Sequence, residues 1–219
     1  MGAGPRPRPR GPGPRHARAG GLGRRRASSP PSATRCAGPG RVLRLPPGAE
    51  IATRDLPEGY ALREATPADR EQVWTVVEDA FLEWSVRGRA SLDDFAAQVW
   101  QRPGSEPWHL QVVTGPDGAV VGAAHGSNTA TEPVDTYVSR LAVAPAHRDR
   151  GLAQALLGAV FAAGRARGAV TSSLATDSRT GALTLYEKVG MRPDSVWVHR
   201  AVRLGPAPGA EEVGPADRG

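Results

Sequence analysis

Residues 141–153 read LAVAPAHRDRGLA and contain the junction that decides the fold. Apolar residues in this stretch and just before it predict a β-strand over 137–144, and the residues after Gly151 predict the start of a helix. The loop between them carries Arg148 and Arg150. A helix start exposes unpaired N–H groups and the positive end of the helix dipole, so an anionic phosphate is a natural ligand there. A solvated loop is the alternative that these residues leave open.

The sequence predicts which side chains share a face in the strand before this loop and in the helix after it. One face of the strand is expected to carry Tyr137, Ser139, Leu141 and Val143, and the other Val138, Arg140 and Ala142. The helix is expected to end near Gly168 and to bury a stripe of Leu152, Ala155, Leu156, Ala159, Val160 and Ala163. Downstream, we expect a strand at 170–175, a helix at 180–189 broken by Gly190, and a strand at 196–203.

Upstream of the junction, the pattern predicts a short strand, two helices and a hairpin. The strand covers 60–63, and the first helix begins with Thr66 as N-cap and Pro67 at the first helical position. Ser91 caps the second helix. The turn formers at 115–118, GPDG, join strands at 109–114 and 119–124. The order of elements predicts a mixed α/β fold with one central sheet.

Two motifs give the sequence a resemblance to the GCN5-related N-acetyltransferase (GNAT) superfamily. Arg148, Gly151 and Ala153 match the family's R/Q-x-x-G-x-G/A signature, which follows a strand ending in L-x-V, here Leu141 and Val143. Residues 181–191, GALTLYEKVGM, resemble its A-x-x-L-Y-x-K-x-G-F block. The resemblance covers roughly 60–204 and is closest to single-domain bacterial members, of actinobacterial type. It implies an acyl-CoA N-acyltransferase fold: a mixed central sheet with a splayed strand pair, flanked by helices.

The resemblance implies an enzyme that transfers an acetyl group from acetyl-CoA to a primary amine by direct attack in a ternary complex. Tyr186 would be the general acid near the sulfur; a core tyrosine at helical spacing is the alternative. The implied cofactor-binding residues are Leu141, Ala142, Val143, Arg148, Asp149, Arg150, Gly151, Leu152, Ala153 and Gln154. A non-catalytic acyl-CoA-binding regulatory module is the second hypothesis, favoured by a departure from the family at 177–179, where Asn is usual and this chain has DSR.

The general base is not decided by the sequence, and neither is the acceptor pocket. The candidate bases are Glu83, His125, Glu132, Asp135 and Asp177, and ordered water beside Ser139 is a further alternative. The aromatic residues of the first half either shape an acceptor pocket or belong to the core; they are Trp74, Phe81, Trp84, Phe95, Trp100 and Trp108. Met191 replaces the usual Phe, a conservative exchange in the core.

The two ends of the chain differ in composition and charge. Residues 1–54 carry twelve Arg and one acid, Glu50, a net charge of +11, whereas residues 55–219 carry sixteen Lys and Arg against twenty-one acids, a net charge of −5. Residues 1–54, rich in Arg, Pro and Gly, are expected to be a disordered tail, with a true start near Val42 or Leu45 as one interpretation. The catalytic domain is expected over 55–204, followed by a flexible tail over 205–219.

Composition also bears on partners and compartment. The acidic domain argues against nucleic acid as a partner, leaving a basic arm that binds nucleic acid as a third hypothesis. A single cysteine, Cys36, and scattered histidines predict no disulfide framework, no metal and a reducing, cytoplasmic compartment. The longest apolar stretch, 152–164, is too short to cross a membrane. The expected partner is a small-molecule or peptide amine; a homodimer is common in the family.

Overall fold

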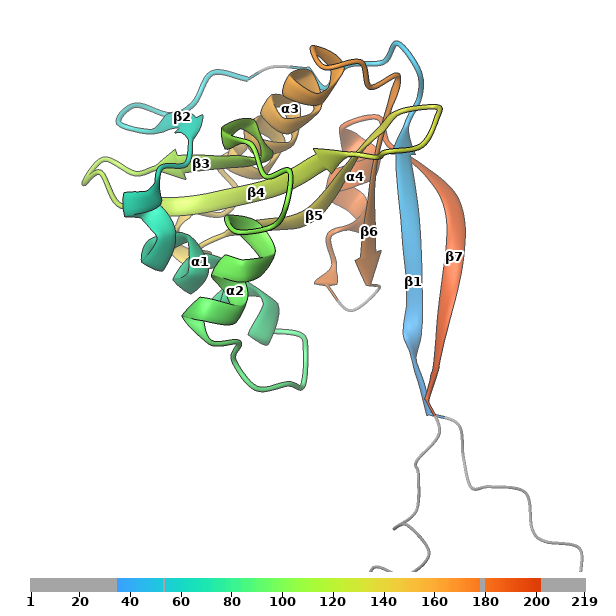
Figure 1. Ribbon diagram of the computed structural model, residues 1–219, viewed down its shortest axis with the longest axis horizontal. Helices are drawn as coiled ribbons and strands as arrows, with labels where there is room; N and C mark the ends of the chain where they lie inside the picture. Colours follow the sequence, from blue (N-terminus) through green and yellow to red (C-terminus); the bar gives the residue numbers. More distant parts are fainter. Residues whose placement is uncertain (1–34, 53, 178–179, 202–219) are drawn as a thin grey trace, which may run out of the picture.

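The computed structural model describes residues 35–52, 54–177 and 180–201, and these build one seven-stranded sheet in the order β2-β3-β4-β5-β6-β1-β7 (Figure 1). Neighbouring strands are antiparallel except β5 and β6, which run parallel. The expected mixed sheet is therefore confirmed. The strands are β1 (Arg35–Leu45), β2 (Ala61–Glu64), β3 (Leu110–Thr114), β4 (Val120–Asn128), β5 (Asp135–Val143), β6 (Thr171–Asp177) and β7 (Arg192–Ala201).

Helices cover both faces of the sheet, and each face has its own apolar cluster. Helices α1 (Arg70–Leu82) and α2 (Leu92–Val99) pack with Ala123 and Ala142 on one face. Helices α3 (Leu152–Arg165) and α4 (Leu183–Lys188) pack with Ala124 and Val143 on the other. Neighbouring residues of a strand thus serve opposite faces, as β-geometry requires.

The local signals at the helix and hairpin starts are confirmed. Asp69 accepts hydrogen bonds from the N–H and hydroxyl of Thr66 at 2.7 and 2.8 Å, and a short 3₁₀ turn, η1 (Pro67–Asp69), leads into α1. The hydroxyl of Ser91 accepts from the N–H of Asp94 at 3.1 Å and caps α2. The hairpin turn closes where Gly115 N–H donates to the Ala119 carbonyl.

The expected boundary at residue 54 is wrong, because the sheet takes up part of that segment. Strand β1 lies between β6 and β7, and both Leu43 and Leu45 are buried against α3 and α4. Ile51 joins the same cluster. In β1, the buried Leu43 and Leu45 lie on either side of the half-buried Arg44, as the pleat of a strand requires. Strands β6 and β7 pair with the backbone of β1, so its Pro- and Gly-rich composition does not prevent a strand. Residues 1–34 and 205–219, which we expected to be tails, lie outside the described residues.

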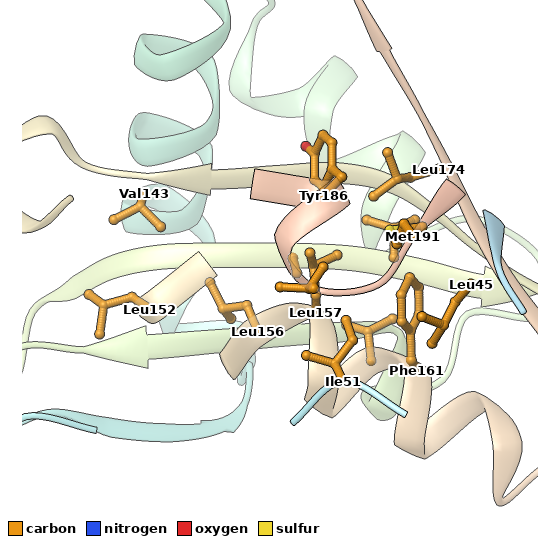
Figure 2. Close-up of a cluster of buried hydrophobic side chains, with 14 of the residues drawn as sticks. Leu45, Ile51, Val143, Leu152, Leu156, Leu157, Phe161, Leu174, Tyr186 and Met191 are labelled. Carbon is orange, nitrogen blue, oxygen red and sulfur yellow. The ribbon is translucent and has the colours of Figure 1, made fainter. Parts of the chain in front are cut away.

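Helix α3 buries a face that differs from the expected stripe. Leu157 and Phe161 are fully buried, whereas Ala155, Ala159 and Ala163 are only half-buried. The large side chains reach into the cluster formed with β1 and α4, where Phe161 lies near Leu45 and Met191 (Figure 2). The expected stripe gave alanines the weight of leucines, but packing favours the side chains that remove most apolar area from water. The buried Met191 confirms the core exchange.

In the part of the chain that the structure describes, no helix is long and apolar enough to cross a membrane.

Candidate functional site

A cleft opens where β5 and β6 separate. The two strands pair from Asp135 with Thr171 to Val138 with Leu174, and the register ends there although both strands continue. Beyond this point, residues of both strands line a cleft of about 650 Å³ together with the ends of α1, α3 and α4. The expected splayed strand pair is therefore present. Backbone groups that would otherwise bond to a neighbouring strand face this opening, and they need another partner.

A β-bulge in β5 marks the start of the splay. His125 pairs with Arg140 and Gly126 with Val138, so Ser139 is the extra residue. The bulge moves Val138 to the α3 face, where it shares a cluster with Val143, and leaves Arg140 directed to α2. The expected alternation of side chains through 137–143 is therefore wrong on the amino-terminal side of the bulge, because the extra residue shifts the pleat by one position.

The loop between β5 and α3 has the backbone that an anion site needs. Asp149 and Gly151 have φ angles of 62° and 79°, in the left-handed region that favours glycine. The hydrogen bond from Ala155 N–H to the Gly151 carbonyl, 3.1 Å long, is the first of α3. The N–H groups of 152–154 are therefore free of helical partners and lie at the positive end of the helix dipole.

Nearly all the residues implied by the resemblance come together at the cleft. Arg150 does not line it and is exposed. The residues that do line it are Leu141, Ala142, Val143, Arg148, Asp149, Gly151, Leu152, Ala153, Gln154 and Tyr186.

The side chain of Arg148 is engaged by protein groups. Its Nη atoms donate to both carboxylate oxygens of Glu83 at 2.9 and 2.6 Å, and its Nε donates to the Val143 carbonyl at 3.0 Å. These hydrogen bonds hold the pKa of Glu83 below its ordinary value. Arg148 thus ties the loop to the end of α1, so its guanidinium is already bonded to protein groups.

Two further cations line the cleft, Arg54 and Lys188. A Cβ atom added to Gly151 would lie 3.7 Å from the Arg54 side chain, so this arginine stands beside the free N–H groups. Arg54 was missed as a site residue because it lies in a segment with the composition of a tail. Lys188 stands inside the second family block, which was the signal for it. Both charges suit an anionic ligand.

Tyr186 stands at the boundary between the core and the cleft. The residue is 7% exposed and belongs to the apolar cluster, yet it also lines the cleft. In Figure 2 its oxygen points away from Leu174 and Met191. Burial raises the pKa of Tyr186 to about 12, so the phenol stays protonated across the neutral range. Tyr186 therefore belongs to the core and also has access to the cleft.

The candidate bases differ sharply in their access to the cleft. Glu83 lines it but is bound by Arg148, and Glu132 does not line it. Asp135 is buried in a network with Arg44, Thr171 and Ser173. Asp177 lines the cleft, while the two residues after it lie outside the described range.

His125 reaches the cleft through Ser139. Its Nδ1 lies 2.8 Å from the hydroxyl of Ser139, which lines the cleft, and its ring lines a second cavity of about 340 Å³ with His109 and Arg102. Burial, helped by the charge of Arg140, lowers the pKa of His125 to about 4. The imidazole is therefore neutral over the whole neutral range.

We expect this buried histidine to make the fold sensitive to mild acid. The unfolded chain binds a proton below the ordinary histidine pKa of about 6.5, while folded His125 does so only near 4, so stability is complete above pH 6.5 and falls as the pH drops towards 4. A shift of this size corresponds to roughly 3 kcal/mol of unfolding free energy. Chemical denaturation at a series of pH values measures it, and His125→Gln should flatten the curve between pH 6.5 and 4.5. An equal slope in the variant would contradict the assignment.

The aromatic residues divide between the cleft and the core. Phe81 and Trp84 line the cleft, with ring centroids 5.5 Å apart. Phe95 and Trp108 are buried, and Trp74 and Trp100 pack against the cluster under α1 and α2. Of these six residues, only Phe81 and Trp84 at the end of α1 therefore offer aromatic surface to a ligand of this cleft.

Comparison with known proteins agrees with this geometry. The model of the acetyltransferase (GNAT) family matches residues 71–191. A search of curated proteins returns no match. Among solved structures, a GCN5-related N-acetyltransferase from Sphaerobacter thermophilus is similar at 26% identity and a TM-score of 0.63, covering 77% of this chain and 53% of that chain.

Two further solved structures share the fold. A GCN5-related N-acetyltransferase from Kribbella flavida is similar at 20% identity and a TM-score of 0.55, covering 78% of this chain and 61% of that one. One from Ralstonia eutropha JMP134 is similar at 24% identity and a TM-score of 0.51, covering 62% and 94%. This chain spans about half the length of the Sphaerobacter protein. The family model matches more than half of the chain, and the matched range includes both motifs. The protein therefore belongs to the GNAT family of acetyltransferases.

Proposed function

We propose that the protein transfers the acetyl group of acetyl-CoA to a primary amine by direct attack in a ternary complex. The observation that carries this proposal is the splay of β5 and β6, which places free strand backbone, the amino-terminal end of α3 and the Tyr186 phenol around one cleft. Acetyl-CoA, when bound, supplies a thioester that an amine can attack. The amine acceptor is a small molecule or a peptide.

The residues present suit this co-substrate. Its pantetheine arm is a chain of amides, and the edge of β5 at Leu141, Ala142 and Val143, which has no pairing with β6, offers hydrogen bonds to such a chain. Its pyrophosphate fits the free N–H groups of 149–154, with the charge of Arg54 beside them. The absence of a side chain at Gly151 leaves that approach open. In this proposal the N–H of Val143 polarises the thioester carbonyl.

Tyr186 acts in this proposal as a hydrogen-bond donor to the leaving sulfur. A thiol has an ordinary pKa of about 8.5, so complete proton transfer from a phenol of pKa about 12 would be uphill by about 3.5 pKa units, or roughly 5 kcal/mol. Donation of a hydrogen bond as negative charge develops on sulfur needs no such transfer. The raised pKa keeps the donor protonated, which is the state this role requires.

Replacement of Tyr186 by Phe should lower kcat about 100-fold while leaving KM for acetyl-CoA nearly unchanged, because the hydroxyl acts mainly in the transition state. Steady-state assay of thiol release measures both constants. Tyr137→Phe is the matched control: this residue does not line the cleft, and loss of its hydroxyl should not change turnover. Unchanged kcat in Tyr186→Phe would leave only the core role.

Proton removal from the amine is assigned to Ser139 and His125. Ser139 faces the cleft at the bulge, and His125 connects its hydroxyl to the second cavity. Because the pKa of His125 is about 4, its neutral imidazole serves to relay a proton and not to hold it. The proton would leave the reacting nitrogen through this pair and reach the second cavity, away from the thioester. Asp177 is the competing group because it also lines the cleft.

The experiment that tests the function is consumption of acetyl-CoA with a panel of primary amines, read as thiol release and as acetylated product. Product with at least one amine supports the enzyme, and Ser139→Ala and Asp177→Asn in the same assay identify which group takes the proton. Tight binding of acetyl-CoA without any product would favour the non-catalytic binding module. Absence of binding at millimolar acetyl-CoA would contradict both.

A further inference from the structure

Arg140 is a half-buried cation on the wall of the cleft. It follows the bulge residue Ser139 on β5 and is directed to the face covered by α1 and α2. The cleft lining includes Arg140 together with Phe81 and Trp84 from the end of α1. The residue therefore lies beside the point where the strands separate, on the sheet face opposite α3.

The side chain of Arg140 is held in place by neutral groups. Its Nη2 donates to the amide oxygen of Gln98 at 2.6 Å, and its guanidinium carbon lies 5.5 Å from the centroid of the Phe95 ring. Both partners belong to α2. A guanidinium has five N–H donors in a fixed fork, so this arrangement orients the group and leaves most of the donors unused.

The charge of Arg140 has no carboxylate partner among the described residues. Other arginines that pack near the sheet use their forks on acids: Arg63 on Asp69 and Arg87 on Glu78, each through two hydrogen bonds. Burial lowers the pKa of Arg140. A cation that is partly removed from water without a counter-ion is unfavourable, and ligand anions are a common reason for such a group.

The acids nearest to this region are already used. Glu78 accepts from Arg87 at 2.7 and 2.9 Å and from the N–H of Ala90 at 2.9 Å. Glu83 is bound by Arg148. Glu78 acts on Arg140 only through its charge and forms no hydrogen bond with it. A rearrangement that gave Arg140 one of these acids would leave another arginine unpaired, so a ligand anion is the direct partner that this site can still accept.

We propose that Arg140 binds a carboxylate carried by the acceptor, so that the preferred substrates are amines that also bear a carboxylate group. This inference rests on the proposed acetyl transfer, since an acceptor exists only if that reaction takes place. The acceptor would then lie on the side of the cleft that α1 and α2 cover. A carboxylate matches the planar fork of a guanidinium, which a second amine or a hydroxyl does not. The aromatic surface of Phe81 and Trp84 would cover the apolar part of such a substrate.

The test compares straight-chain amino carboxylates of two to six carbons with their carboxamides, with rates corrected for the fraction of free amine. Carboxylates should be preferred by at least about tenfold in kcat/KM, since a charge-assisted pair is stronger than a neutral hydrogen bond. The chain length with the highest kcat/KM then reports the distance from the guanidinium to the reacting nitrogen. Equal kcat/KM for carboxylates and carboxamides in the wild-type protein would overturn the proposal without any variant.

Two variants locate the preference. Arg140→Gln removes the charge and can still bond to Gln98, and it should bring the ratio of carboxylate to carboxamide close to one. Arg89→Gln is the control, since this arginine lies on the same face, pairs with Asp79 and does not line the cleft. A preference that persists in Arg140→Gln would overturn the assignment. Thermal unfolding with acetyl-CoA checks that each variant is folded.

These outcomes separate the two proposals. Turnover of amines without any preference for carboxylates would remove the inference about Arg140 and leave the acetyltransferase standing. No turnover with any amine would remove both. A binding readout gives an independent arm: amino carboxylates should stabilise the complex with acetyl-CoA against heat, and their carboxamides should do so much less.

Discussion

Replacement of Gly151 by Glu is expected to abolish stabilisation by acetyl-CoA, with a loss of affinity of at least about 100-fold. The new carboxylate would stand at the free N–H groups of α3, repel a pyrophosphate and offer those groups an internal acceptor instead. In the wild-type protein, a ligand at 100 times its Kd adds about 2.7 kcal/mol to the free energy of unfolding. Thermal unfolding with and without acetyl-CoA measures the difference, which is roughly 5–10 °C for a domain of this size.

Backbone strain is the complication, and the chain offers a matched control for it. Gly151 has a φ of 79°, so any side chain there costs about 1–2 kcal/mol in the absence of ligand. Gly118, in the turn between β3 and β4, also has a φ of 79° and has open space around it. Gly118→Glu should lower the melting temperature to a similar degree yet keep the full shift with acetyl-CoA. A full shift in Gly151→Glu as well would place the ligand elsewhere.

Replacement of Gly164 by Ala should destabilise the fold by about 3 kcal/mol. The added methyl would overlap the hydroxyl of Thr136 and lie 2.8 Å from the side-chain oxygen of Asn128. These two groups form a hydrogen bond of 2.9 Å, and the Asn128 amide also donates to the Gly164 carbonyl at 3.1 Å. The substitution therefore combines overpacking with the loss of buried hydrogen bonds. Equilibrium denaturation gives the free energy directly.

Gly158 supplies the comparison within the same helix. An added Cβ there meets nothing within 4 Å. Gly158→Ala should therefore raise stability by up to about 1 kcal/mol, because alanine has the higher helix propensity. Opposite signs for two identical substitutions in α3 would show that contact with β5, and not helix propensity, requires the glycine at 164. A neutral Gly164→Ala would contradict that explanation.

Most elements of this fold could be predicted from sequence because their signals are local. The apolar runs of β3 and β4, the turn formers at 115–118 and the caps at Thr66 and Ser91 all act within a few residues. The helix start after Gly151 could be predicted equally well, since its signals lie within that segment. Local signals therefore gave the order of elements from β2 onwards and the position of the loop before α3.

The errors arise where contacts between distant segments decide the outcome. Strand β1 exists because β6 and β7 flank it, and nothing in its own composition indicates those neighbours. The bulge at Ser139 depends on the register with β4, and it reversed the faces assigned around Val138. The pairing of Arg148 with Glu83 joins two elements that are far apart in the chain. Each of these three features depends on tertiary contacts, which the periodicity of the sequence does not indicate.

The position of β1 has a consequence for how the chain reaches its final state. β1 comes first among the described strands, yet it sits between β6 and β7, which the ribosome makes last. Until those strands appear, Leu43 and Leu45 have no completed core to enter. Long-range pairing of this kind raises contact order and slows folding, because a large loop must close first. The sheet can close only after synthesis of the domain is nearly complete, so a nascent chain that stalls before β6 would expose β1 to other partners.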